Sequence, residues 1–192
     1  YIVRQDGSTF HTFFFDVGSG EAKFGKTFQG FSDESCWARG QAWGVLGFPL
    51  NYKYVKNPVF LEKAKIIANY FLNRSPQDLV AYWDLIFDEN SGQEKDSSSS
   101  AIVVCGLLEL IKHLANQEEI EYYSNAAHRI LNALIENYMS KTEEQTQARA
   151  LLLHGVYAKP LHGFGVDEGN LWGDYYFLEA LIRISTNWNS YW

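Results

Sequence analysis

Two neighbouring helical segments of opposite character constrain the fold of this chain more than any other feature. Residues 101–115, AIVVCGLLELIKHLA, are apolar almost throughout, whereas residues 118–140, EEIEYYSNAAHRILNALIENYMS, carry apolar and charged side chains at helical spacing. A helix that is apolar on all sides must be buried, and an amphipathic helix covers a core with one face. The pair therefore predicts an inner and an outer layer of helices.

The same alternation recurs along the chain as helical hairpins joined by long loops. A closed double ring of such hairpins needs about twice as many helices as the five predicted here. We therefore expect an all-α fold in which residues 1–192 form about half of a single toroidal domain. The five predicted helices span residues 35–48, 58–74, 101–115, 118–140 and 171–184.

Helix boundaries follow from capping residues and prolines. Asp33, Glu34 and Ser35 offer N-cap chemistry for the first helix, and Pro49 is expected to kink or end it. Asn57 followed by Pro58 is a typical start for the second helix. Residues 9–15 alternate like a short strand before a turn at residues 16–22, and the loop at residues 147–170 has some strand character.

The net charge of −7 excludes nucleic acid as the main partner, because phosphate binding requires clustered basic side chains. Cys36 and Cys105 lie in apolar helical context and are expected to be buried thiols, which indicates a reducing, cytoplasmic location. No apolar run is long enough for a membrane span. The chain starts at Tyr1 without an initiating methionine and is interpreted as part of a longer protein.

The segment SCWARGQAWGVLGF, residues 35–48, combines features that conflict in an ordinary helix. Cys36, Gly40, Gly44 and Gly47 form a small-residue stripe that would let another backbone approach. Arg39 lies near the helix N-terminus, where the macrodipole disfavours a cation unless an anion also binds there. Two interpretations remain open: Arg39 binds a carboxylate ligand beside tryptophan walls, or it pairs with an acidic neighbour while the tryptophans are core.

The two tryptophans are Trp37 and Trp43, and the acidic neighbours of Arg39 are Asp33 and Glu34. His11 and Gln29 are further polar candidates in aromatic surroundings, although such a histidine is often structural. Aromatic residues make up 16% of the chain, which suits a concave site for amphipathic ligands such as sugars.

Other polar residues are expected to have structural roles. Asp96 should cap the apolar helix, and Asp174 should cap or pin the last one. His154, Tyr157 and His162 cluster in the late loop but lack a carboxylate or cysteine at metal-ligand spacing. No phosphate-binding loop, dinucleotide fingerprint or zinc motif is present, so no cofactor or metal is expected.

Several blocks together resemble the unsaturated glucuronyl hydrolases of glycoside hydrolase family 88. They occur in the family's order and span nearly the whole chain: FHTFFFD, TFQG, SCWARGQAWGVLGF, KDSSSSAIVVCGLLEL, LWGDYYFLEALIRI and WNSYW. The resemblance implies the C-terminal half of an (α/α)6 barrel. It also implies an enzyme that removes a 4,5-unsaturated uronic acid from the non-reducing end of lyase-generated oligosaccharides by hydrating the C4=C5 double bond. In this family an aspartic acid protonates C4 and directs water to C5, without a metal.

By matching positions, the resemblance implies that Trp37, Trp43, His11, Gln29 and Arg39 line the unsaturated-sugar subsite. Arg39 would neutralise or orient the anionic substrate, the tryptophans would stack on or wall the sugar ring, and His11 and Gln29 would bond to hydroxyls or the carboxylate. A loop tyrosine near the adjoining subsite matches Tyr157.

The chain departs from the family pattern in two places. The family's two essential aspartates lie upstream of Tyr1, and none of Asp33, Asp84, Asp96 or Asp174 matches their motifs. Family members that accept sulfated fragments have Ser and Lys before GVDEGN, where this chain has KPLHGF at residues 159–164.

Two alternative functions stay open: an unsaturated rhamnogalacturonyl hydrolase, and an inactive carbohydrate-binding remnant. The isolated half-barrel is expected to be inactive and to expose an apolar edge. Either the missing N-terminal half or a second copy of the chain would cover that edge.

Overall fold

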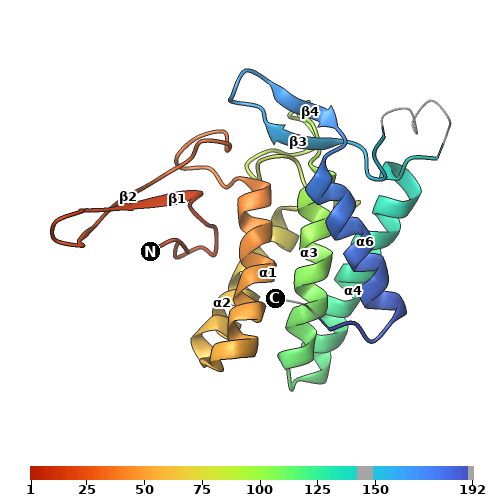
Figure 1. Cartoon of the computed structure of the whole chain (residues 1–192), viewed down its shortest axis with the longest axis horizontal. Helices are drawn as coiled ribbons and strands as arrows, with labels where there is room; N and C mark the ends of the chain where they lie inside the picture. The colour runs from red at the N-terminus through yellow and green to blue at the C-terminus, as the bar shows by residue number, and fades with distance from the viewer. Residues whose placement is uncertain (142–148, 190–192) are drawn as a thin grey trace.

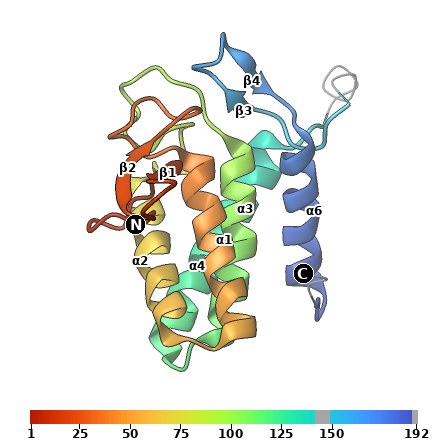
Figure 2. The same cartoon turned by 60° about the vertical axis from the view of Figure 1, so that its left-hand side comes forward.

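In the computed structural model, which describes residues 1–141 and 149–189, five α-helices pack in two layers (Figures 1 and 2). The inner layer consists of α1 (Ala38–Val55), α3 (Ser97–Leu110) and α6 (Leu171–Ser185). The outer layer consists of α2 (Pro58–Arg74) and α4 (Gln117–Ala133). Helix α3 contacts α1, α6 and α4, while α2 covers α1. The arrangement agrees with the two layers predicted from the sequence.

Helix α3 lies at the centre of the molecule because its sequence offers no polar face. All 14 of its residues are buried, including the four serines of its first turn. Those serines were predicted to precede the helix, but they form its start. The chain continues into a 3-10 turn at Ile111–His113, and α4 ends in a π-helical turn at Leu134–Tyr138. None of the described helices is long and apolar enough to cross a membrane.

The close approach between inner helices occurs at α3 and not along the predicted stripe of α1. A Cβ atom at Gly106 would lie 2.7 Å from the carbonyl carbon of Val45. The atoms nearest to a Cβ atom at Gly44 belong to the side chains of Ile67 and Thr9, and a Cβ atom at Gly47 would meet nothing within 4 Å. The stripe prediction was therefore wrong. The spacing of glycines along α1 does not show at which glycine another helix backbone comes close.

Helix α1 begins later and ends later than predicted. Trp37 occupies the N-cap position, and its indole has no acceptor that could cap the helix. Ser35 and Asp33, which were expected to cap it, bond to Asp84 and to the backbone N–H of Thr27 instead. Pro49 lies inside the helix, which continues for six more residues to Val55. The side chain of Asn51 donates to the carbonyl of Gly47, at 2.8 Å.

The N-caps of α2, α3 and α6 agree only partly with the residues predicted from the sequence. Asn57 accepts a hydrogen bond from the backbone of Val59, as its sequence context predicts. Asp96 lies at the N-cap position of α3, but its side chain does not cap the helix. Asn170 caps α6, whereas Asp174 pins the preceding loop by accepting two backbone N–H groups, from Leu151 and Leu152.

Two small antiparallel hairpins flank the N-terminal end of the inner helices (Figure 1). Strands β1 (Thr12–Phe15) and β2 (Ala22–Lys26) form the first, and β3 (Gly155–Ala158) and β4 (Phe164–Glu168) form the second. Both regions had been predicted to contain extended chain. Residues 147–148 of the late loop and the last three residues of the WNSYW block lie outside the described part. Cys36 and Cys105 are buried and free, as predicted.

Candidate functional site

A cleft of about 440 Å³ opens beside the first turns of α1, where the N-terminal segment lies against this helix. Four of the six residues proposed from the sequence line it: His11, Gln29, Trp37 and Trp43. The remaining lining is mostly apolar: Ile2, Thr9, Phe10, Gly40, Gly44 and Phe48. An aromatic hollow with a few polar groups is typical of a site for a small amphipathic ligand.

The two tryptophans come from the start of α1 and the turn that follows. Trp37 is 7% exposed and Trp43 is 37% exposed. A Cβ atom at Gly40 would lie 2.8 Å from the Trp37 ring, so glycine lets this ring lie against the helix. The Trp43 ring packs edge-on against Tyr176 of α6, with ring centroids 5.3 Å apart. The packing leaves one largely buried and one half-open aromatic wall.

The hydrogen bonds of His11 define its chemical state. Its Nδ1 accepts a hydrogen bond from the backbone N–H of Phe28 at 3.2 Å. Burial lowers the pKa of His11, and the positive charge of Arg39 lowers it further. A neutral ring whose Nδ1 accepts must carry its proton on Nε2. His11 can therefore donate one hydrogen bond, and its ring lies 4.5 Å from that of Trp37.

Gln29 is hydrogen-bonded to the late hairpin. Its Nε2 donates to the carbonyl of Tyr157 at 3.0 Å, which links residues 128 positions apart. This bond orients the amide, so that Oε1 is the acceptor available to a ligand. The Tyr157 side chain is 45% exposed, and its ring packs beside Trp172 at 5.4 Å. Tyr157 therefore lies next to the cleft, although it does not line it.

Arg39 lies behind the cleft wall and is only 3% exposed. Its guanidinium forms an ion pair with Asp96 at 2.9 Å and donates to the backbone carbonyls of Val156 and Tyr157. The same group lies 4.7 Å from the Trp37 ring and 5.1 Å from the Trp172 ring. Neither acidic neighbour considered from the sequence is its partner. The pairing was missed because Asp96 is 57 residues away.

A second buried carboxylate organises the approach to α1. Asp84 is fully buried and accepts backbone N–H groups from Phe31, Cys36 and Ile86 and the hydroxyl of Ser35. It thereby fixes the loop that carries Gln29 and Trp37. No local sequence signal marks Asp84, because most of its partners precede it by about 50 residues.

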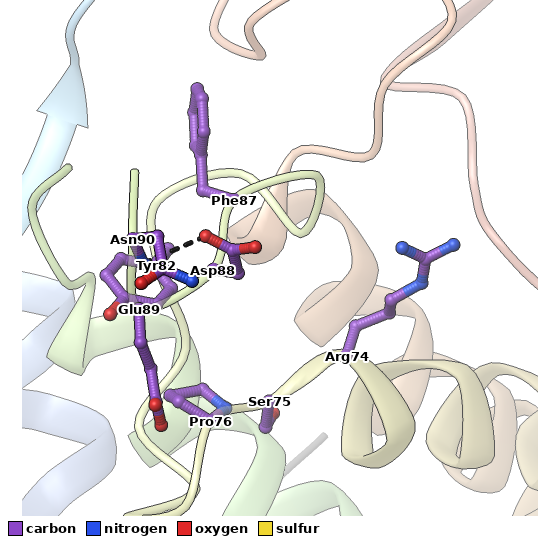
Figure 3. A pocket seen from close by; sticks show the side chains of 8 residues that line it. All are labelled: Arg74, Ser75, Pro76, Tyr82, Phe87, Asp88, Glu89 and Asn90. Carbon is purple, nitrogen blue, oxygen red and sulfur yellow. Dashed lines mark hydrogen bonds between the residues drawn. The ribbon is translucent and has the colours of Figure 1, made fainter. Parts of the chain in front are cut away.

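A smaller hollow of about 210 Å³ lies where α2 ends and the long loop to α3 begins, and Figure 3 shows its lining. Its side chains are Arg74, Ser75, Pro76, Tyr82, Phe87, Asp88, Glu89 and Asn90. None of the residues proposed from the sequence lies here. Asp88 already accepts the backbone N–H of Asn90 at 2.9 Å, as an ordinary turn residue does. We therefore take the aromatic cleft at α1 as the candidate site.

The late-loop histidines form no metal site. His154 pairs with Asp167, at 2.7 Å between Nδ1 and Oδ1, and His162 is exposed in the turn between β3 and β4. Throughout residues 1–141 and 149–189, no group of three or more His, Cys, Asp or Glu side chains could hold a metal ion.

Comparison with known proteins assigns this helical chain with its aromatic cleft to a family of glycoside hydrolases. The model of Glycosyl Hydrolase Family 88 matches residues 19–186, and the chain belongs to this family. The chain is 51% identical over 192 residues to the unsaturated chondroitin disaccharide hydrolase of Streptococcus pneumoniae (strain ATCC BAA-255 / R6), covering all of this chain and 48% of that protein. It is 41% identical over 193 residues to the unsaturated glucuronyl hydrolase of Bacillus sp. (strain GL1), covering all of this chain and 50% of that protein.

Solved structures agree with these relationships. The crystal structure of unsaturated glucuronyl hydrolase from Streptococcus agalactiae superimposes with a TM-score of 0.94 at 52% identity, over all of this chain and 48% of that chain. The chain therefore spans about half the length of the curated relatives it matches.

Proposed function

We propose that this chain is the C-terminal half of an unsaturated glucuronyl hydrolase with an (α/α)6 barrel. The cleft carries this proposal: His11, Gln29, Trp37 and Trp43 come from separate positions within residues 11–43 and line one hollow in a family 88 chain. A relative from Streptococcus agalactiae has been solved as a complex with dGlcA-GalNAc6S, which supports an unsaturated uronic-acid oligosaccharide as the ligand.

The cleft residues would hold the terminal sugar during hydration of its C4=C5 bond. Trp37 and Trp43 wall the ring, His11 donates through Nε2–H, and Gln29 accepts a sugar hydroxyl through Oε1. Protonation of C4 and delivery of water to C5 give a hemiketal, which collapses and releases the next sugar. We place the aspartates that perform these proton transfers in the N-terminal half of the enzyme. Tyr157 would contact the adjoining sugar.

Arg39 would orient the ligand indirectly, by holding Trp37 and the Tyr157 carbonyl in place, without supplying net charge. Its guanidinium is already compensated by Asp96 and is covered by Trp37 and Trp172. Of the two roles that the family resemblance implies for Arg39, neutralising the substrate and orienting it, we therefore assign the second.

The complementary half of the barrel is the proposed partner. Helix α6 exposes an apolar face that an inner-layer helix would bury against a neighbour: Leu171, Tyr175, Leu178 and Ile182. The two free, buried cysteines are compatible with a reducing, cytoplasmic location for the whole enzyme.

Hydrolysis of an unsaturated disaccharide, followed as loss of ultraviolet absorbance, tests the division of labour between the halves. The isolated 192 residues should show no turnover, and strong turnover would refute the placement of the acid outside this chain. Calorimetry tests the cleft itself. Trp43→Ala should weaken disaccharide binding about tenfold or more, since stacking and burial of one aromatic ring contribute on the order of 1–3 kcal/mol. Phe24→Ala, on the first hairpin and outside the cleft, is the control.

The two alternative functions give different results in the same assays. Preference of the completed enzyme for unsaturated rhamnogalacturonan products would identify a rhamnogalacturonyl hydrolase. Binding without turnover by the completed enzyme would identify a carbohydrate-binding remnant.

A further inference from the structure

Asp96 lies at the convergence of four structural elements, and each of its carboxylate oxygens is bonded. It is fully buried at the start of α3. Its Oδ2 pairs with Arg39 of α1 at 2.9 Å, and its Oδ1 accepts the hydroxyl of Ser98 and the backbone N–H of Val156 in β3. Ser98 in turn accepts the indole N–H of Trp172 in α6 at 3.2 Å. The three inner helices and the late hairpin thus meet at one carboxylate.

Arg39 transmits this anchoring to the cleft. Its second nitrogen, Nη2, donates to the carbonyl of Tyr157, and the same carbonyl accepts from Nε2 of Gln29. Its guanidinium also stacks beside Trp37. Two cleft residues, Gln29 and Trp37, therefore depend on the position of one buried arginine, which has Asp96 as its counter-ion.

We propose that Asp96 is a positioning residue for the sugar cleft, acting through Arg39 to fix Trp37 and the Tyr157 carbonyl that orients Gln29. Asp96 does not line the cleft and would act without contacting the ligand. This inference rests on the proposed function in one respect, namely that the ligand of the cleft is an unsaturated uronic-acid sugar.

Asp96→Asn tests this role with little change in shape. Asparagine retains one oxygen for Ser98 and Val156 but removes the charge opposite Arg39, which becomes a buried cation without a counter-ion. The dissociation constant for an unsaturated chondroitin disaccharide, measured on the 192-residue chain by calorimetry, should rise about tenfold or more. An unchanged constant would overturn the proposal.

Glu109→Gln is the matched control. Glu109 is also a buried carboxylate of α3 paired with an arginine of another inner helix, Arg183, at 2.9 Å. It lies near the opposite end of α3 from Asp96. Its substitution should lower stability but leave the dissociation constant within about twofold. An equal loss of binding in both variants would mean that Asp96 acts only through general stability, and would overturn the proposal.

A double variant tests whether Asp96 affects the cleft through Arg39 or by another route. In an Arg39→Gln background, Asp96→Asn should have little further effect on the dissociation constant. A further tenfold loss there would contradict the proposed route. The double variant also serves if Asp96→Asn alone does not fold, because it buries neither charge.

A sugar-free measurement distinguishes this inference from the proposed function. The indole N–H resonances of Trp37 and Trp172, assigned by single Phe substitutions, should shift in Asp96→Asn and remain in place in Glu109→Gln. If the wild-type chain binds no disaccharide, the proposed ligand fails while these shifts still test the positioning contact. Unshifted resonances would overturn the contact whatever the ligand.

Discussion

Gly106 of α3 faces Val45 of α1 so closely that a Cβ atom at Gly106 would lie 2.7 Å from the Val45 carbonyl carbon. Gly106→Ala should therefore force the two central helices apart. We expect a loss of about 1–3 kcal/mol in the free energy of unfolding, as is usual for overpacking, measured by urea denaturation.

The control for this substitution is Gly47→Ala. Gly47 lies inside α1, and a Cβ atom there would meet nothing within 4 Å. Alanine should raise stability by roughly 0.5–1 kcal/mol, because glycine is the poorer helix residue. Equal destabilisation by both substitutions would mean that the helix spacing at Gly106 is not the cause.

Stability should fall between about pH 7.5 and pH 5.5 because of His11. Burial and the charge of Arg39 lower its pKa from the ordinary value of 6.5, so the unfolded chain takes up a proton before the folded chain does. Stability from the neutral ring is thus present above pH 6.5 and is lost as the pH falls towards the lowered value. His113, whose pKa burial also lowers despite the nearby Glu109, adds in the same direction.

Urea denaturation at about pH 7.5 and at about pH 5.5 measures the contribution of His11 to the pH dependence of stability. His11→Gln should reduce the difference in unfolding free energy between the two pH values, whereas His162→Gln, on an exposed turn, should not. An unchanged difference in the His11 variant would remove this residue from the explanation.

Gln41 should contribute more to the stability of the fold than an exposed glutamine does. It is fully buried, and its Nε2 donates to the carbonyls of Gly7 and Ile67, which ties the N-terminal segment to α1 and α2. Gln41→Leu removes the donor that serves both carbonyls. It should lower the free energy of unfolding, measured by urea denaturation, by about 1–3 kcal/mol. The exposed Gln5, changed to Leu, should cost less than about 0.5 kcal/mol. Hydrogen exchange near Gly7 should also accelerate in the Gln41 variant.

Both thiols should be unreactive in the folded chain. Burial raises the pKa of Cys36 to about 12 and raises that of Cys105 well above its ordinary value. Because the thiolate is the reactive form, iodoacetamide at pH 8 should label neither cysteine in buffer and both in urea. Rapid labelling of Cys105 in buffer would show that α3 opens readily.

The apolar face of α6 should drive association of the isolated chain. Leu178 and Ile182 are 45% and 44% exposed on this face. The double substitution Leu178→Lys and Ile182→Lys should shift the chain towards monomer in sedimentation experiments, because lysine opposes apolar contact. Val59→Lys, on the exposed side of α2, should leave the association unchanged. A wild-type chain that is monomeric at all accessible concentrations would contradict this prediction.

The two layers of helices could be predicted because hydrophobic periodicity is local. The uniformly apolar stretch of α3 and the Asn57–Pro58 start of α2 both identify their elements without reference to the rest of the chain. The start of α1 could not be predicted, since Ser35 bonds to Asp84 instead of capping the helix. Local capping rules do not include a distant carboxylate that competes for the same groups.

The candidate site shows the same division between local and distant information. The residue types around Trp37 left a ligand site and a packed core with an ion pair both open, and only the family resemblance favoured a sugar site. The structure brings His11, Gln29 and Trp43 to the same cleft as Trp37. The partner of Arg39 could not be inferred, because spacing along the sequence favoured acids within the same segment over Asp96. Buried ion pairs between helices depend on tertiary packing, which no single segment specifies.

The bond between Gln29 and Tyr157 has a consequence for the order in which this protein matures on the ribosome. The two residues are separated by 128 positions, and Arg39 reaches the same late hairpin. Helices α1 and α2 can pair as soon as they emerge, but Gln29 and Arg39 must wait for the hairpin that supplies their shared acceptor. The hydrogen bonds that fix this side of the cleft therefore form only with the last fifth of the chain.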